Sequence, residues 1–224
     1  MNYLYLLLES IIVFLLLIIF YKKGKKDGLF LYIGFITSLL GIMMFKLSDF
    51  LSFPVNYGLP MVMGIFIANN IIIQKFGLDE IKKIIYTFGI SFITTLAVIC
   101  LCSMVTSSEY DLVTNKAFNG IFGYDLVNVR SFIGLLLSIG FMLWYNGEIY
   151  YYIRKSKNNL VFSNIGSILI IQFVESVIFV VISFSGMYDG IMIFGMIVIR
   201  YLIKVVIGVI GLVPVILINK RKEM

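Results

Sequence analysis

The chain of 224 residues is 61% hydrophobic and 13% charged, with a mean hydropathy of +1.04 and a net charge of +6. Soluble domains carry about 25% charged residues, so this composition excludes an ordinary soluble protein and indicates a polytopic membrane protein. The positive charge does not point to a nucleic-acid partner, because Lys and Arg accumulate in the cytoplasmic loops of membrane proteins. The length leaves no room for a soluble domain, and we expect one transmembrane domain over residues 1–224.

Seven apolar runs follow one another along the chain, and each predicts a membrane-spanning helix of roughly 20 residues. They cover about residues 3–20, 29–45, 60–76, 84–105, 130–152, 160–185 and 191–218. The first run has neither the basic start nor the cleavage site of a signal peptide, so we take it as a helix. The connectors, including the longest polar stretch at 106–128, are predicted to be loops. The sequence therefore predicts an all-α, multi-pass protein of the plasma membrane.

The basic residues predict how these helices are oriented. Thirteen of the 18 Lys and Arg follow the first, third, fifth and seventh helices, three lie on the opposite side, and two lie inside the last helix. Because basic residues favour the cytoplasmic side, we expect the N-terminus outside and the C-terminus in the cytoplasm.

The residues needed for most enzyme chemistry are missing from this sequence. There is no His, and the only cysteines, Cys100 and Cys102, are two positions apart, so they do not share a helix face. No G-x-x-x-x-G-K-[ST], H-E-x-x-H or G-x-S-x-G motif occurs. We therefore expect no enzyme activity, no catalytic residues, no metal and no cofactor, and we favour transport as the function.

The last two predicted helices carry charged residues near their centres. Glu175 lies in the sixth helix with Gln172 and Ser176 on the same face, and Arg200 and Lys204 lie four positions apart in the seventh. A charge at the centre of a membrane helix costs about 2.5–3.5 kcal/mol by insertion scales, and such residues are usually paired or functional. We expect Glu175 to pair with Lys204 or Arg200. A purely structural pair remains open, but two basic groups facing one acid favour a substrate site.

Polar residues in other helices are further candidates. Asn70 and Gln74 share a face of the third helix, and Asn146 lies in the inner half of the fifth. Amides in membrane helices commonly form interhelical hydrogen bonds worth about 1 kcal/mol, so a structural role and a binding role are both open. Glu9 is a candidate counter-ion for the basic pair of the last helix, and Glu148 is expected to snorkel to the cytoplasm.

Four blocks of this sequence resemble the queuosine precursor transporter family, also called the VUT or vitamin uptake transporter family. Residues 66–77 resemble the family's F-x-A-T-D segment, 129–155 its central helix, 172–179 its Q-x-x-D-[ST]-x-x-F block, and 201–204 with Pro214 its Y-x-x-K block and late proline. The last two blocks are the most specific, because their polarity and spacing are unusual in membrane helices.

The chain departs from the family pattern at the acidic positions of these blocks. Asn70, Gln74 and Asn146 stand where the family usually has acids, and Glu175 stands where it has Asp. An acid accepts hydrogen bonds from the N1–H and exocyclic amine of a guanine-like edge. The loss of these carboxylates would therefore change which hydrogen bonds the protein forms with a guanine-like edge of the substrate.

The resemblance implies uptake of a 7-deazapurine, such as preQ0, preQ1 or queuine, for tRNA modification. On this hypothesis the substrate lies at mid-membrane between the third, fifth, sixth and seventh helices. Gln172, Glu175 and Asn70 would bind its edges, Arg200 and Lys204 would set the charge state of Glu175, and aromatic rings would stack on it. The partners would be this small molecule and the bilayer, with homo-oligomerisation open. Two alternatives remain: a substrate-binding subunit of an energy-coupling-factor importer, and a non-transporting membrane partner protein.

Overall fold

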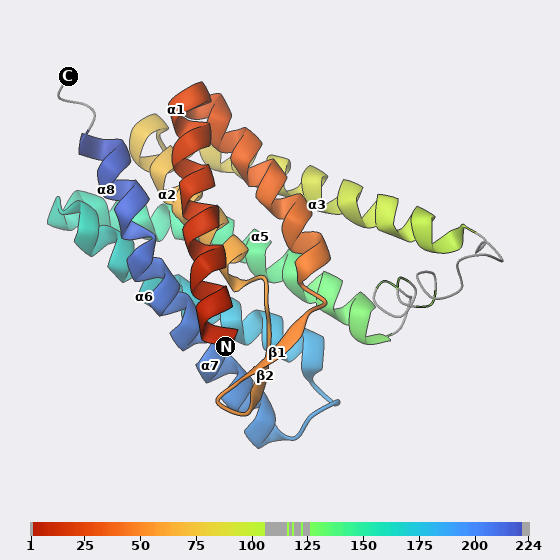
Figure 1. The fold of residues 1–224 in the computed structure, drawn as a ribbon. Coiled ribbons are helices and arrows are strands. Elements are labelled where there is room, and N and C mark those ends of the chain that lie inside the picture. Colours follow the sequence, from red (N-terminus) through yellow and green to blue (C-terminus); the bar gives the residue numbers. More distant parts are fainter. Residues whose placement is uncertain (1, 106–115, 117, 119–121, 123–125, 221–224) are drawn as a thin grey trace.

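The computed structural model describes residues 2–105, 116, 118, 122 and 126–220. The described chain is almost entirely helical, with a single two-stranded sheet (Figure 1). The elements are α1 (Asn2–Met43), β1 (Leu47–Phe50), β2 (Phe53–Asn56), α2 (Leu59–Phe76), η1 (Leu78–Glu80), α3 (Ile81–Met104), α5 (Leu126–Lys157), α6 (Leu160–Phe184), α7 (Gly190–Ile210) and α8 (Leu212–Lys220). Within the described residues, six helical stretches are long and apolar enough to cross a membrane. The predicted all-α, multi-pass architecture is confirmed.

The first of these stretches, α1, folds back on itself at Lys25. This residue has non-helical torsion angles, φ 45° and ψ −112°, and the helix continues on both sides of it. The two arms, 2–24 and 26–43, then run side by side (Figure 1), and the Tyr32 hydroxyl of the second arm donates to the carbonyl of Val13 in the first at 3.2 Å. The two helices expected in this part of the chain are therefore present, but a one-residue break joins them instead of a loop.

Gly28 allows the two arms of α1 to approach closely, which gives a first prediction. A Cβ atom at Gly28 would lie 2.0 Å from the carbonyl oxygen of Phe20, whereas one at Gly24 would meet nothing within 4 Å. Gly28→Ala must therefore push the arms apart, at a cost of about 1–3 kcal/mol. We expect a lower thermal midpoint for Gly28→Ala in detergent and an unchanged one for Gly24→Ala. Equal midpoints would contradict this role of Gly28.

The connector between α1 and α2, predicted to be a loop, forms an antiparallel β-hairpin. Its strands pair in a register that places Phe50 opposite Phe53. The two turn residues, Leu51 and Ser52, both have positive φ, at 51° and 68°. The hairpin packs against α7, where a Cβ at Gly195 would lie 1.9 Å from the ring of Phe53. It therefore covers the end of the bundle at which the chain begins.

The α2 helix forms the centre of the bundle. In α2, 83% of the most apolar window is buried, compared with 28% in α1 and 22% in the η1–α3 stretch. Gly64 permits this central position, because a Cβ there would lie 2.4 Å from the Tyr32 hydroxyl of α1. Polar side chains on α2 consequently face other helices and not lipid.

Two of the predicted helices differ from those in the structure. The helix expected at 130–152 is longer, because α5 begins at Leu126 and continues through its basic end to Lys157. The helix expected at 191–218 is interrupted at Gly211, which separates α7 from α8. Pro214 accounts for this interruption, because it lacks the N–H group that would bond to the carbonyl of Ile210.

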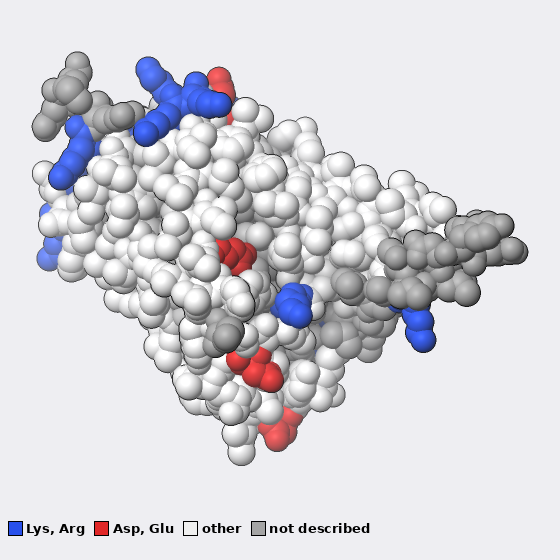
Figure 2. Space-filling view, in the orientation of Figure 1, with Lys and Arg blue, Asp and Glu red and all other residues white. Residues whose placement is uncertain are grey.

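Basic residues gather at one end of the bundle, near α8 and the turn of α1 (Figure 2). The last turns of α2, α5 and α8 all carry Lys or Arg. We call this the basic end, and the positive-inside rule predicts that it faces the cytoplasm.

Candidate functional site

Three ionised side chains meet in the interior of the bundle, where α5, α6 and α7 pack together. Glu175 of α6 accepts from the Arg200 guanidinium at 3.1 Å on one carboxylate oxygen and from the Lys204 ammonium on the other. The Ser138 hydroxyl of α5 also donates to Glu175 at 3.1 Å. Glu175 and Lys204 are fully buried, and Arg200 is 2% exposed. We call Glu175, Arg200 and Lys204 the charged triad.

The triad contains one more positive than negative charge. Arg200 and Lys204 reach the same carboxylate because residues four apart lie on one face of a helix. The surplus positive charge is partly compensated, since the Arg200 guanidinium lies 4.0 Å from the centre of the Phe179 ring, within the range of a cation–π contact. A buried charge that loses its partner strongly destabilises a protein, so Arg200 and Lys204 both depend on Glu175.

Gln172 lies one turn from Glu175 on α6. Its backbone carbonyl accepts from the Lys204 ammonium at 3.1 Å, and its side-chain amide donates to the sulfur of Met142 at 3.4 Å. Ser176 is buried beside them, but its hydroxyl donates to the Gln172 carbonyl of its own helix at 2.7 Å. Ser176 therefore has its donor satisfied within α6, whereas Gln172 joins α6 to both α5 and α7.

The predicted amides form a second group, nearer the basic end. Asn70 of α2 donates to the side-chain oxygen of Asn164 at 2.9 Å and to the hydroxyl of Ser167 at 3.4 Å. Asn146 of α5 donates to the side-chain oxygen of Asn70 at 2.6 Å. These four residues, the amide cluster, are fully buried and connect α2, α5 and α6.

Gln74 does not join the amide cluster and lies one helical turn farther toward the basic end. Its side-chain oxygen accepts from the Tyr150 hydroxyl at 3.2 Å, and its amide nitrogen donates to Asn219 of α8 at 2.9 Å. These three residues line a cavity of about 880 Å³ at the basic end. We call this cavity the vestibule; Lys25, Lys75 and Arg154 also line it.

A line of residues that winds slowly around α5 connects the triad to the vestibule. Ser138, Met142, Asn146, Tyr150 and Arg154 follow one another at intervals of four residues and contact, in this order, the triad, Gln172, the amide cluster, Gln74 and the vestibule. At 1.5 Å per residue this series spans about 24 Å. We call it the polar stripe, and it crosses most of the thickness of a bilayer core.

Several buried polar atoms in or beside this stripe have no hydrogen-bond partner within the described part of the chain. They include three acceptors, the side-chain oxygens of Asn69, Asn146 and Gln172, and two donors, the Nε of Arg200 and one terminal nitrogen of Arg154. Buried polar groups in native proteins are nearly always paired, so each exception calls for an explanation. These three acceptors and two donors remain available to a ligand.

The structure does not bring every predicted residue to the triad. The expected pairing of Glu9 with the basic residues of α7 is wrong, because neither carboxylate oxygen of Glu9 bonds to any described residue. The face that α1 presents to α7 instead carries Leu6 and Ser10, which line a cavity together with Ile203. Glu148 is exposed, as expected for a snorkelling side chain.

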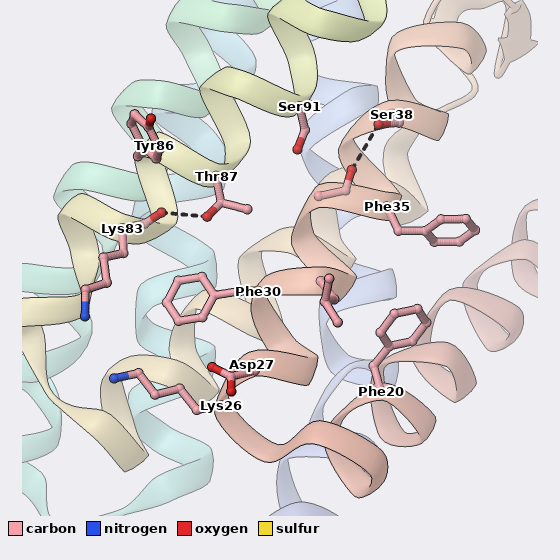
Figure 3. Close-up of a pocket in the computed structure, with 12 residues that line it drawn as sticks. Phe20, Lys26, Asp27, Phe30, Phe35, Ser38, Lys83, Tyr86, Thr87 and Ser91 are labelled. Carbon is pink, nitrogen blue, oxygen red and sulfur yellow. Dashed lines mark hydrogen bonds between the residues drawn. The ribbon is translucent and has the colours of Figure 1, made fainter.

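A separate groove lies between the second arm of α1 and α3 (Figure 3). This groove of about 1050 Å³ is mostly apolar, and none of the triad or amide-cluster residues lines it. Two of its hydroxyls are satisfied locally, since Ser38 and Thr87 each donate to a carbonyl of their own helix. Leu31 and Tyr86 beside it are 66% and 69% exposed. We expect lipid, not substrate, to contact this face.

Five residues for which the sequence predicted no binding role contribute to these contacts. They are Ser138, Tyr150, Asn164, Ser167 and Asn219. The interval of four residues that joins Ser138, Asn146 and Tyr150 could have revealed two of them. Asn164, Ser167 and Asn219 gave no comparable signal, because their partners lie on other helices.

Comparisons with known proteins agree with this architecture. The family model described as "Putative vitamin uptake transporter" matches residues 56–218. The chain is 28% identical over 206 residues to the "Probable queuosine precursor transporter" of Bacillus subtilis (strain 168), a match that covers 91% of this chain and 88% of that protein. No solved structure matches. Because the family model spans the triad, the amide cluster and most of the polar stripe, the chain belongs to the vitamin uptake transporter family and is a multi-pass membrane transporter of the cell membrane.

Proposed function

We propose that this transporter imports a small planar polar compound, most specifically a 7-deazapurine precursor of queuosine. The observation that carries the proposal is the set of unpaired buried acceptors beside the charged triad and the amide cluster, together with the unpaired Nε donor of Arg200. A 2-amino-4-oxo-pyrimidine edge, as in a 7-deazaguanine, presents adjacent N–H donors and one carbonyl acceptor. The name of the Bacillus subtilis relative supports the same class of substrate.

The residues of the stripe have complementary roles in this proposal. The side-chain oxygens of Gln172 and Asn146 accept from N–H groups of the substrate, and the Arg200 Nε donates to its carbonyl. Glu175 provides the one carboxylate of the triad, and substrate binding there weakens its bonds to Arg200 and Lys204. Asn70, Gln74 and Ser176 complete the set of substrate-binding residues. When its bonds to Arg200 and Lys204 weaken, Glu175 needs a hydrogen-bond partner on the substrate. Because those bonds join α6 to α7, substrate binding is coupled to movement of these helices.

The polar stripe supplies the route from this site. Ser138, Asn146, Tyr150 and Arg154 offer polar groups along α5, with each interval of four residues spanning about 6 Å, so a substrate leaving the triad finds further hydrogen-bond partners on its way. In the orientation expected from the basic residues, the stripe leads toward the cytoplasm. This direction corresponds to import.

Uptake of labelled preQ0, preQ1 and queuine, each supplied singly to cells that cannot synthesise queuosine, tests the proposal. We expect the wild-type chain to restore queuosine in tRNA with at least one of them. Glu175→Ala and Lys204→Ala should abolish uptake, and Glu148→Ala, which changes an exposed acid, should not. The assay is done in cells without energy-coupling-factor ATPases, so that activity there excludes a role as a subunit of such an importer.

Two results would contradict these assignments. Wild-type uptake by Glu175→Ala and Lys204→Ala variants that reach the membrane would remove the triad from the site. Failure of every 7-deazapurine to be taken up, with the protein present in the membrane, would remove the substrate class.

A further inference from the structure

The vestibule concentrates unpaired positive charge. Lys25, Lys75 and Arg154 line it, and no Asp or Glu is among the described residues that do so. None of the three belongs to an ion pair within the described chain. By contrast, Lys26 and Lys83 at the same end both pair with Glu80, at 2.8 and 3.5 Å. Three cations without an acidic partner among the described residues thus line one cavity.

Arg154 is the best-placed group of the three. One terminal nitrogen of its guanidinium is buried and has no hydrogen-bond partner among the described residues. The position of Arg154 at the end of the polar stripe directs it to the same cavity as Tyr150 and Gln74. A guanidinium presents paired N–H donors that match the oxygens of a phosphate group, a geometry that Lys cannot reproduce.

The remaining walls suit a ligand that also has a flat or apolar part. The rings of Tyr21, Phe76, Tyr150 and Tyr151 line the vestibule, and the Lys75 ammonium lies 5.4 Å from the centre of the Tyr21 ring. The volume of about 880 Å³ is within the range of small-molecule sites, roughly 300–1,000 Å³. The cavity therefore combines cations, rings and sufficient room.

Lys25 reaches the vestibule through an unusual backbone conformation. It is the residue at which α1 reverses direction, with φ 45°, in a region that residues other than Gly adopt rarely. The same turn that forms the α1 hairpin thus places a third cation in the lining of the vestibule.

We propose that the vestibule binds a phosphate-bearing anion, with the phosphate group held by Arg154, Lys75 and Lys25. Two sources share this chemistry: the headgroup of an anionic phospholipid, and a free organic phosphate such as a nucleoside monophosphate. The proposal does not depend on which compound is transported, because the vestibule is a turn beyond the amide cluster and its test involves no uptake.

Binding to the purified full-length protein in nanodiscs distinguishes the two sources. In phosphatidylcholine discs, inorganic phosphate and adenosine monophosphate are titrated with adenosine as the uncharged control, and the thermal midpoint and affinity are measured. In parallel, discs containing phosphatidylglycerol are compared with phosphatidylcholine discs, and retained lipid is detected by native mass spectrometry. Stabilisation by adenosine monophosphate but not adenosine identifies a soluble phosphate ligand, and selective retention of phosphatidylglycerol identifies a lipid.

Arg154→Gln and Lys155→Gln form a matched pair for this experiment, since they remove adjacent positive charges of the same helix end and Lys155 is exposed and does not line the vestibule. We expect Arg154→Gln to weaken binding about tenfold or more, as for a lost charge-assisted hydrogen bond, and Lys155→Gln to change it less than about twofold, as for a screened surface charge. Equal losses in the two variants would show a general surface effect and overturn the proposal. Absence of binding by every phosphate probe and by phosphatidylglycerol would overturn it as well.

Discussion

Glu175→Gln is expected to be the most destabilising polar substitution in the described bundle. The change keeps the shape of the side chain but removes the only negative charge of the triad, leaving Arg200 and Lys204 buried without a counter-charge. Breaking a buried ion pair in this way costs about 3–5 kcal/mol. For a chain of this length we expect the thermal midpoint in detergent to fall by on the order of 10 °C.

The double variant Glu175→Gln with Lys204→Met provides the control for this charge argument. It restores the net charge of the triad to +1, the value in the wild-type chain. We therefore expect the thermal midpoint of the double variant to be higher than that of Glu175→Gln alone and lower than that of the wild type. A double variant less stable than Glu175→Gln alone would show that packing around Lys204, and not charge, dominates.

Lys204→Met, unlike Glu175→Gln, is expected to retain the stability of the wild type while losing transport. Glu175 keeps its bonds to Arg200 and Ser138 at 3.1 Å each, so no buried charge is left without a partner. Removing one member of a buried ionic group is strongly destabilising when it leaves a charge without a counter-charge, but in Lys204→Met the remaining Arg200 still neutralises Glu175. The thermal midpoint should therefore stay within about 3 °C of that of the wild type.

Uptake by Lys204→Met should nevertheless fall at least about tenfold, the size expected for loss of a charge-assisted contact. Lys157→Met, an exposed lysine at the basic end, is the matched control and should transport normally. If Lys204→Met were stable and transported at the wild-type rate, the triad would be a structural element that joins α6 and α7. The combination of stability and transport thus separates the two interpretations that the sequence left open.

The helices were predictable because each is a long apolar run, and the triad was predictable because its residues recur at helical spacing near the middle of two such runs. The β-hairpin was not, because its left-handed turn residues are Leu51 and Ser52, whereas such turns usually carry Asn or Gly. The division between α7 and α8 could have been read from Pro214, which disrupts the hydrogen bonds of the preceding turn.

Contacts between helices were harder to predict than the helices themselves. Asn70 faces Asn146 and Asn164 because α2 is central and lies against both α5 and α6, an arrangement that no local pattern encodes. Glu9 illustrates the same difficulty. Its position along α1 fitted a counter-ion for Arg200 and Lys204, but its side chain is not on the face of α1 that meets α7. Spacing along a helix identifies which residues share a face, whereas the packing of the bundle decides what that face meets.

The surplus charge of the triad has a consequence for energetics in a living cell. A transmembrane potential acts on every charge that moves through its field, with about 2.3 kcal/mol per elementary charge for a full crossing at 100 mV. Because Arg200 and Lys204 together outweigh Glu175, any rearrangement that shifts the triad along the membrane normal moves net charge, even with a neutral substrate. An inside-negative potential would then favour the state in which the triad lies nearer the cytoplasm. That conformational step would be voltage-dependent, and the resting voltage of the cell would set how the transporter is divided between its inward-facing and outward-facing states.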